Sequence, residues 1–164
     1  MSRKKQREED RIAEQVVEAV LGGATLSELR GISSSQMGEL YAYAHHFYEQ
    51  GRLDDAEKFF HFLCIYDFYN PQYWMGLAAV HQLKKDYQKA IDLYAIAFAQ
   101  GKDDYLSMFY SGQCQLALGK AGKARACFEC VLEQVAEPAL RKHAQAYLDA
   151  LARVESDLSE EETV

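Results

Sequence analysis

The sequence lacks any apolar run approaching the ~18 residues that a membrane-spanning helix needs. Its first ten residues are rich in charge and lack the apolar stretch of a secretory signal. Glycine-rich phosphate loops and the G-x-S-x-G nucleophile motif are also missing. We therefore expect a cytoplasmic protein without stable membrane association, and these patterns give no indication of an enzyme.

Positive charge is scarce, since the formal net charge is −7, which argues against direct nucleic-acid binding. Cys127 and Cys130 form a C-x-x-C motif, but neither a second such motif nor a suitably spaced histidine pair accompanies it. A redox pair normally opens a helix after a strand, whereas this one lies inside a helical repeat. The sequence therefore predicts no catalytic residue, no metal site and no cofactor.

What is present is a repeat with a period of 34 residues. Each copy has a small residue where its first helix meets the second, a small residue that opens the second helix, and an aromatic residue one turn later. In the order of the repeats these are Ala44, Ala78 and Gly112; Ala56, Ala90 and Ala124; and Phe60, Tyr94 and Phe128. The pattern is typical of tetratricopeptide repeats, and it predicts an all-α solenoid of three tandem helix-turn-helix units.

Helix signals divide the chain further. Gly51 is placed to end a helix, and Asn70 followed by Pro71 is the favoured start of the next one. A solenoid also needs a terminal helix to cover its last repeat. We expect a disordered basic tail (1–10), an N-terminal helical region for dimerisation (11–36), three repeats within 37–138 (37–70, 71–104 and 105–138), a C-terminal capping helix (139–156) and an acidic tail (157–164).

The first helix of each repeat carries a second, largely apolar stripe at helical spacing. In a stacked array these helices line one concave surface, and exposed apolar side chains there are typical of a binding groove. The alternative is that some of these side chains are ordinary core, covered by the N-terminal or C-terminal helices. The predicted groove residues are Tyr41, His45 and Tyr48; Met75, Ala79 and Gln82; and Phe109, Gln113 and Leu116.

A further apolar stripe precedes the repeats. It either pairs two copies of the chain or folds onto the first repeat, and we favour pairing into a homodimer. Its members are Ile12, Val16, Val17, Val20 and Leu21.

Particular stretches resemble the class II chaperones of bacterial type III secretion, which serve the translocator proteins, and the invasion-type branch above all. The resemblance covers roughly residues 11–150 and is carried by residues 23–26, 62–70, 76–79, 94–99 and 112–116. It implies a cytoplasmic chaperone that holds an extended apolar segment from near the translocator N-terminus in its concave groove. By similarity, Tyr41, His45 and Tyr48 fall on aromatic groove positions.

The resemblance also implies homodimers that use the N-terminal helix. Such a chaperone would prevent hydrophobic translocators from aggregating or associating prematurely before secretion. An alternative function is a regulatory scaffold that acts as co-activator partner of an AraC-type transcription activator.

Overall fold

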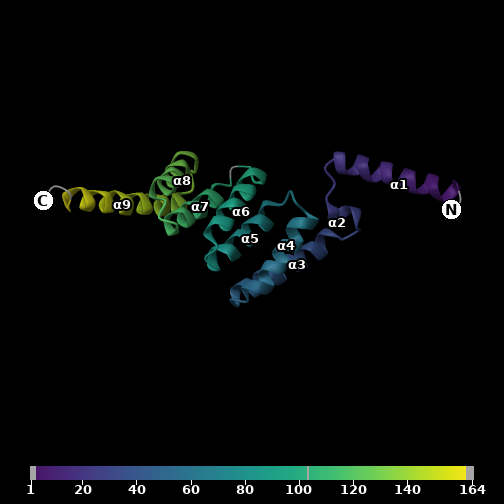
Figure 1. The fold of residues 1–164 in the computed structure, drawn as a ribbon, viewed down its shortest axis with the longest axis horizontal. Helices are drawn as coiled ribbons and strands as arrows, with labels where there is room; N and C mark the ends of the chain where they lie inside the picture. Colours follow the sequence, from purple (N-terminus) through teal and green to yellow (C-terminus); the bar gives the residue numbers. More distant parts are fainter. Residues whose placement is uncertain (1–2, 103, 162–164) are drawn as a thin grey trace.

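The computed structural model describes residues 3–102 and 104–161. Its helices are arranged one after another along the molecule, from α1 on the right of Figure 1 to α9 on the left, so the two ends of the chain lie far apart. No strand is present among these residues. The helices are α1 (Arg3–Leu21), α2 (Leu26–Leu29), α3 (Ser34–Glu49), α4 (Leu53–Tyr66), α5 (Pro71–Leu83), α6 (Tyr87–Gln100), α7 (Tyr105–Ala117), α8 (Ala121–Gln134) and α9 (Pro138–Glu161). The predicted all-α fold is confirmed.

Local signals position these helices. A capping box opens α2, because Thr25 N–H donates to Glu28 Oε2 at 2.9 Å while the Thr25 hydroxyl accepts from Glu28 N–H. Asn70 caps α5, where its side chain accepts from Gln72 N–H at 3.0 Å. Gly51 adopts a φ of +71° between α3 and α4, a left-handed conformation that glycine adopts at little cost.

The three hairpins α3–α4, α5–α6 and α7–α8 stack in sequence, and each repeat mark serves this packing. The small residues Ala44, Ala78, Ala56, Ala90 and Ala124 are fully buried. They let the paired helices approach closely. The aromatic residue one turn into each second helix is also buried and fills the space beside the first helix.

Buried side chains form two clusters along the solenoid. One joins α3 to α7 and is continuous beneath the first two hairpins, with Phe60, Leu63, Val80 and Tyr94 among its largest members. The other lies between α7, α8 and α9 around Phe128. The solenoid therefore contains a larger core under the first two hairpins and a smaller one closed by α9.

The ends of the chain differ from the prediction. Residues 3–10 belong to α1 and residues 157–161 belong to α9, whereas disordered basic and acidic tails were expected there. Both stretches are free of glycine and proline and rich in good helix formers, so charge alone does not keep them from forming helix. The remaining parts of the two predicted tails, 1–2 and 162–164, lie outside the described residues. None of the described helices has the length and hydropathy required to cross a membrane.

Candidate functional site

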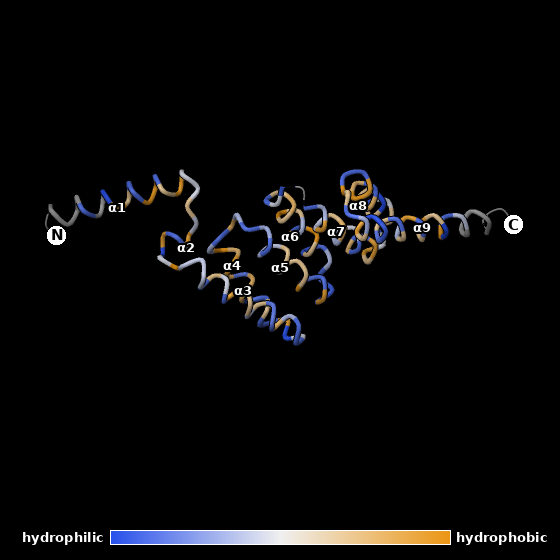
Figure 2. Tube along the Cα trace, turned by 180° about the vertical axis from the view of Figure 1, so that it is seen from behind, coloured by the Kyte–Doolittle hydropathy of each residue, from blue (hydrophilic) through white to orange (hydrophobic). Residues whose placement is uncertain are grey.

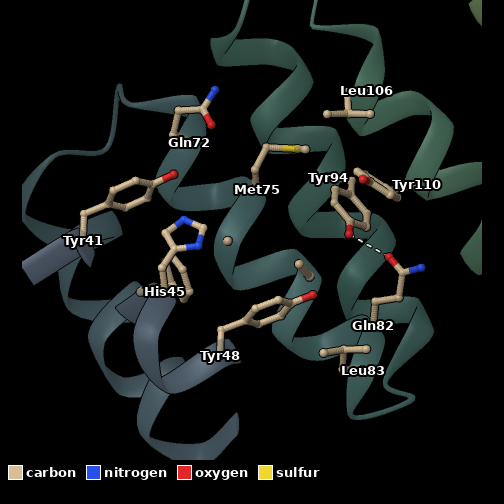
Figure 3. A pocket seen from close by; sticks show the side chains of 13 residues that line it. Tyr41, His45, Tyr48, Gln72, Met75, Gln82, Leu83, Tyr94, Leu106 and Tyr110 are labelled. Carbon is tan, nitrogen blue, oxygen red and sulfur yellow. Dashed lines mark hydrogen bonds between the residues drawn. The ribbon is translucent and has the colours of Figure 1, made fainter. Parts of the chain in front are cut away.

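A pocket of about 330 Å³ opens where α3, α5, α6 and α7 meet (Figure 3). It is mainly apolar, and α3 and α5 contribute most of its walls. Six predicted groove residues line it: Tyr41, His45 and Tyr48 from α3, and Met75, Ala79 and Gln82 from α5. The structure thus brings the stripes of the first two repeats together around one hollow.

Aromatic contacts fix the α3 wall. The Tyr41 ring lies edge-on to His45, with ring centroids 4.5 Å apart, and it also packs against Tyr73 at 5.4 Å. His45 in turn meets the ring of Phe60 at 5.4 Å. The imidazole is therefore held as a wall residue by packing on two sides.

The floor of the pocket depends on a glycine, Gly76, which has no side chain. A Cβ atom placed on Gly76 would lie 2.1 Å from the ring of Phe60, far inside van der Waals contact. Phe60 is fully buried and lines the pocket together with Gly76. The glycine therefore lets an aromatic ring reach the backbone of α5 and shape the floor.

The third repeat presents a different face from the one predicted. Phe109 is 5% exposed and packs against Phe128 and Tyr147, and Leu116 packs in the same cluster beneath α9. For these two residues the structure agrees with the alternative of ordinary core covered by the C-terminal helix. Gln113 lies instead in a second, shallower hollow with Tyr110 and Tyr147.

Other residues of the pocket were missed from the sequence. From α7, Leu106 and Tyr110 complete the pocket, and Gln72, Leu83 and Tyr94 contribute from α5 and α6. The 34-residue period relates 106 and 110 to 72 and 76, but none of these four positions lies on the predicted stripes. Whether these positions face the pocket depends on how far each hairpin is rotated relative to the one before.

A chain of hydrogen bonds links side chains of α6, α5, α7 and α9 in turn. The Tyr94 hydroxyl donates to Gln82 Oε1 at 2.7 Å, Gln82 Nε2 donates to Gln113 Oε1 at 3.2 Å, and Gln113 Nε2 donates to the Tyr147 hydroxyl at 2.9 Å. Figure 3 shows the first of these bonds at the edge of the pocket. We call these four side chains the amide ladder.

The tyrosine hydroxyls of the pocket stay neutral, because their pKa values are raised. Burial raises the pKa of Tyr41, and burial together with the nearby Tyr110 raises that of Tyr48. Burial also raises the pKa of Tyr94 far above its usual value. These phenols therefore act at neutral pH as uncharged hydrogen-bonding groups on an apolar surface.

None of the four cysteines lines this pocket. All four are free, and burial raises the pKa of Cys64 to about 12 and that of Cys114 to about 11. Burial also raises the pKa of Cys127, the first cysteine of the C-x-x-C motif. Such thiols remain protonated at neutral pH and are poor nucleophiles or metal ligands.

The N-terminal stripe is not covered by the rest of the chain. Ile12, Val16, Val17, Val20 and Leu21 are between 42% and 83% exposed. In Figure 2, α1 projects away from the stacked hairpins and carries hydrophobic and hydrophilic residues in alternation. The alternative that this stripe folds onto the first repeat is therefore wrong in this structure.

Comparisons with known proteins agree with this architecture. The family model for the tetratricopeptide repeat matches residues 37–70 and 71–104. The chain is 56% identical over 154 residues to the chaperone protein SicA of Salmonella typhimurium, and the match covers 94% of this chain and 93% of SicA. The chain belongs to the class II chaperones of type III secretion. The predicted resemblance is confirmed, and so is the prediction that the chain is not an enzyme.

Solved structures are similar to this class II chaperone over most of its length. One is the Yersinia enterocolitica chaperone SycD in complex with a peptide of the translocator YopD, with 26% identity, a TM-score of 0.71, and coverage of 76% of this chain and 98% of that one. Another is SycD in an alternative dimer, with 26% identity, a TM-score of 0.72, and coverage of 76% and 97%. The three-repeat solenoid is therefore a fold that this family shares.

Proposed function

We propose that this class II chaperone binds an extended apolar segment from near the N-terminus of hydrophobic translocator proteins in the pocket between α3, α5 and α7. Binding there keeps the translocators from aggregating and from associating with one another before secretion. The observation that carries this proposal is the open apolar pocket of about 330 Å³ at the face predicted from the repeat stripes. SycD, a relative with the same fold, has been solved with a translocator peptide.

The size and chemistry of the pocket suit such a client. An extended segment inserts one or two apolar side chains into a rigid concave face, and aromatic walls supply large contact area. Tyr41, Tyr48 and Met75 offer that area around the opening. A short segment also loses conformational entropy on binding, which keeps the affinity moderate and permits release.

The proposal includes the cytoplasm as the place of action and a homodimer as the working form. The uncovered stripe on α1 supports pairing. Covering its water-exposed apolar side chains with a second copy removes them from water, which lowers the free energy of the pair. A relative, SycD, has been solved as a dimer, which supports a homodimer as the working form.

The test is co-purification of translocators with the Tyr41→Ala/Tyr48→Ala double variant. Both substitutions remove aromatic area from the pocket while leaving α3 helical, because alanine is the best helix former. We expect the wild-type chain to retain its clients and the double variant to lose them, with unchanged circular dichroism. The matched control is Tyr43→Ala, on the same helix, whose side chain is 57% exposed and lies outside the pocket. Full client recovery with the double variant would refute the proposal.

The regulatory alternative makes a different prediction. A scaffold for an AraC-type transcription activator would keep its partner in cells that lack the translocators. A chaperone purified from such cells would carry no client. Affinity purification from translocator-deleted cells followed by mass spectrometry therefore separates the two functions.

A further inference from the structure

The amide ladder has a direction. Tyr94 is only 2% exposed, so its hydroxyl hydrogen needs an acceptor within the protein, and Gln82 Oε1 accepts it. That bond fixes Gln82 with its Nε2 toward Gln113, and the next bond fixes Gln113 with its Nε2 toward Tyr147. Each member after Tyr94 accepts one hydrogen bond from the member before it.

This direction determines which groups remain for a ligand. An amide nitrogen carries two hydrogens and a phenol carries one. The ladder uses one hydrogen of Gln82 Nε2 and one of Gln113 Nε2, so each amide keeps a second hydrogen, and Tyr147 keeps its hydroxyl hydrogen. The oxygens of these side chains have each accepted a bond already. The ladder therefore presents three unused hydrogen-bond donors to a ligand, beside the second lone pairs of its amide oxygens.

The ladder also connects the main pocket and the second hollow. Gln82 lines the main pocket, and Gln113 and Tyr147 line the second hollow. Tyr110 lines both, which makes the two hollows neighbours on one surface. All three donors therefore lie along a single path from α5 across α7 to α9.

We propose that the amide ladder binds main-chain carbonyl groups of the extended client and guides it from the main pocket over Tyr110 to α9. This inference rests on the proposed function, and it assigns to Gln82, Gln113 and Tyr147 a role that apolar anchoring alone leaves out. Every residue of an extended chain has a carbonyl acceptor, so donors of this kind hold a client in place without reading its sequence.

Gln113→Glu tests the proposal with little change in shape. A glutamate at 113 still accepts from Gln82 Nε2 and accepts in addition from the Tyr147 hydroxyl, so the ladder survives with its last bond reversed. The hydrogens that Gln113 and Tyr147 offer to a client are lost, and a negative charge faces the client carbonyls instead. The matched control is Gln134→Glu, which adds the same charge at an exposed position of α8 outside both hollows.

The probe is the client segment that the wild-type chain protects from limited proteolysis in the co-purified complex, prepared as a fluorescein-labelled synthetic peptide. We expect fluorescence anisotropy to report a loss of affinity of about tenfold or more for Gln113→Glu, as for two lost hydrogen bonds, and no change for Gln134→Glu. Equal binding by Gln113→Glu and wild type would overturn the inference while leaving the proposed function intact. Failure to recover any client with the wild-type chain would instead contradict the proposed function.

A second arm separates carbonyl recognition from an indirect effect on folding. Peptides in which single backbone amides are replaced by esters have weaker carbonyl acceptors at chosen positions. We expect some of these esters to weaken binding to wild type and to have no further effect on Gln113→Glu, which is coupling in a double-mutant cycle. Additive losses at every position would overturn the proposal.

Discussion

At the scale of single residues, His81 is a buried titratable group that lies between two carboxylates. Its ring is 4% exposed, with Nε2 3.4 Å from Glu57 Oε1 and Nδ1 3.5 Å from Asp86 Oδ2. Neither ring nitrogen has a hydrogen-bond partner in the part of the chain that the structure describes. Burial and the nearby Lys89 and Lys84 lower the pKa of His81 more than the two carboxylates raise it.

This lowered pKa predicts a stability that depends on pH. The unfolded chain takes up the proton at the ordinary histidine pKa of about 6.5, whereas folded His81 resists protonation until a lower pH. Its contribution to stability is therefore fully present above about pH 6.5 and is lost as the pH falls toward the folded pKa. We expect the melting temperature to fall between about pH 7 and pH 5 in the wild type and to fall less in His81→Phe, as measured by thermal circular dichroism.

The pH range of this effect lies above the range in which the carboxylates titrate. Hydrogen bonds from Lys84 lower the pKa values of Asp54 and Glu57, so their contributions to stability are lost as the pH falls from the ordinary carboxylate pKa of about 4 to the lowered values. His61→Phe is a suitable control, because this residue lies exposed on α4. Parallel melting profiles for wild type and His81→Phe above pH 5 would contradict the prediction.

At the scale of helices, local signals were sufficient to locate most starts and stops. Thr25 with Glu28, Asn70 with Pro71, and Gly51 each act within a few residues of the chain, so their effect can be read from the sequence. The same reasoning failed at both ends, where charged stretches looked like tails. Charge alone does not prevent a helix when the residues are good helix formers.

The face that each helix presents was harder to predict. On α3 and α5 the predicted stripe lines the pocket, whereas on α7 the packing of α9 covers Phe109 and leaves Tyr110 for the pocket. The 34-residue period gives equivalent positions but contains no information about the rotation between hairpins. That rotation depends on contacts between residues far apart in the sequence.

The exposed stripe on α1 gives a prediction about assembly. Val16→Gln/Val20→Gln makes the stripe polar while keeping residues that suit a helix. We expect this double variant to lose the pairing of two chains, so that light scattering reports half the wild-type mass, with the repeats still folded. The control is Arg11→Gln/Glu18→Gln, which at helical spacing lies on the side of α1 opposite the stripe and should keep the wild-type mass. An unchanged mass for the valine variant would rule out pairing through this stripe.

At the scale of the whole molecule, stability is divided between two cores. Tyr147 of α9 stacks on Phe128 with ring centroids 4.7 Å apart and an interplanar angle of 10°, and it meets Phe109 at 5.7 Å. The smaller core therefore depends on a helix that lies outside the three repeats. In a solenoid each unit contacts mainly its neighbours, so α9 takes the place of the missing fourth hairpin.

Removal of this contact should be costly. We expect Tyr147→Ala to lower the free energy of unfolding by about 2–3 kcal/mol, since a large aromatic ring leaves a partly closed cavity. Tyr43→Ala, at an exposed ring, should change it by less than about 0.5 kcal/mol. Urea denaturation followed by circular dichroism measures both values. A Tyr147→Ala variant as stable as Tyr43→Ala would mean that α9 does not support the third repeat.

The contact between Gly76 and Phe60 has a genetic consequence. Every amino acid other than glycine has a Cβ atom, and the space for that atom is occupied by the ring of Phe60. No missense change at codon 76 is therefore conservative, not even one to alanine. In a saturation mutagenesis library selected for secretion, this codon should tolerate only synonymous changes, although the residue bears no functional group of its own.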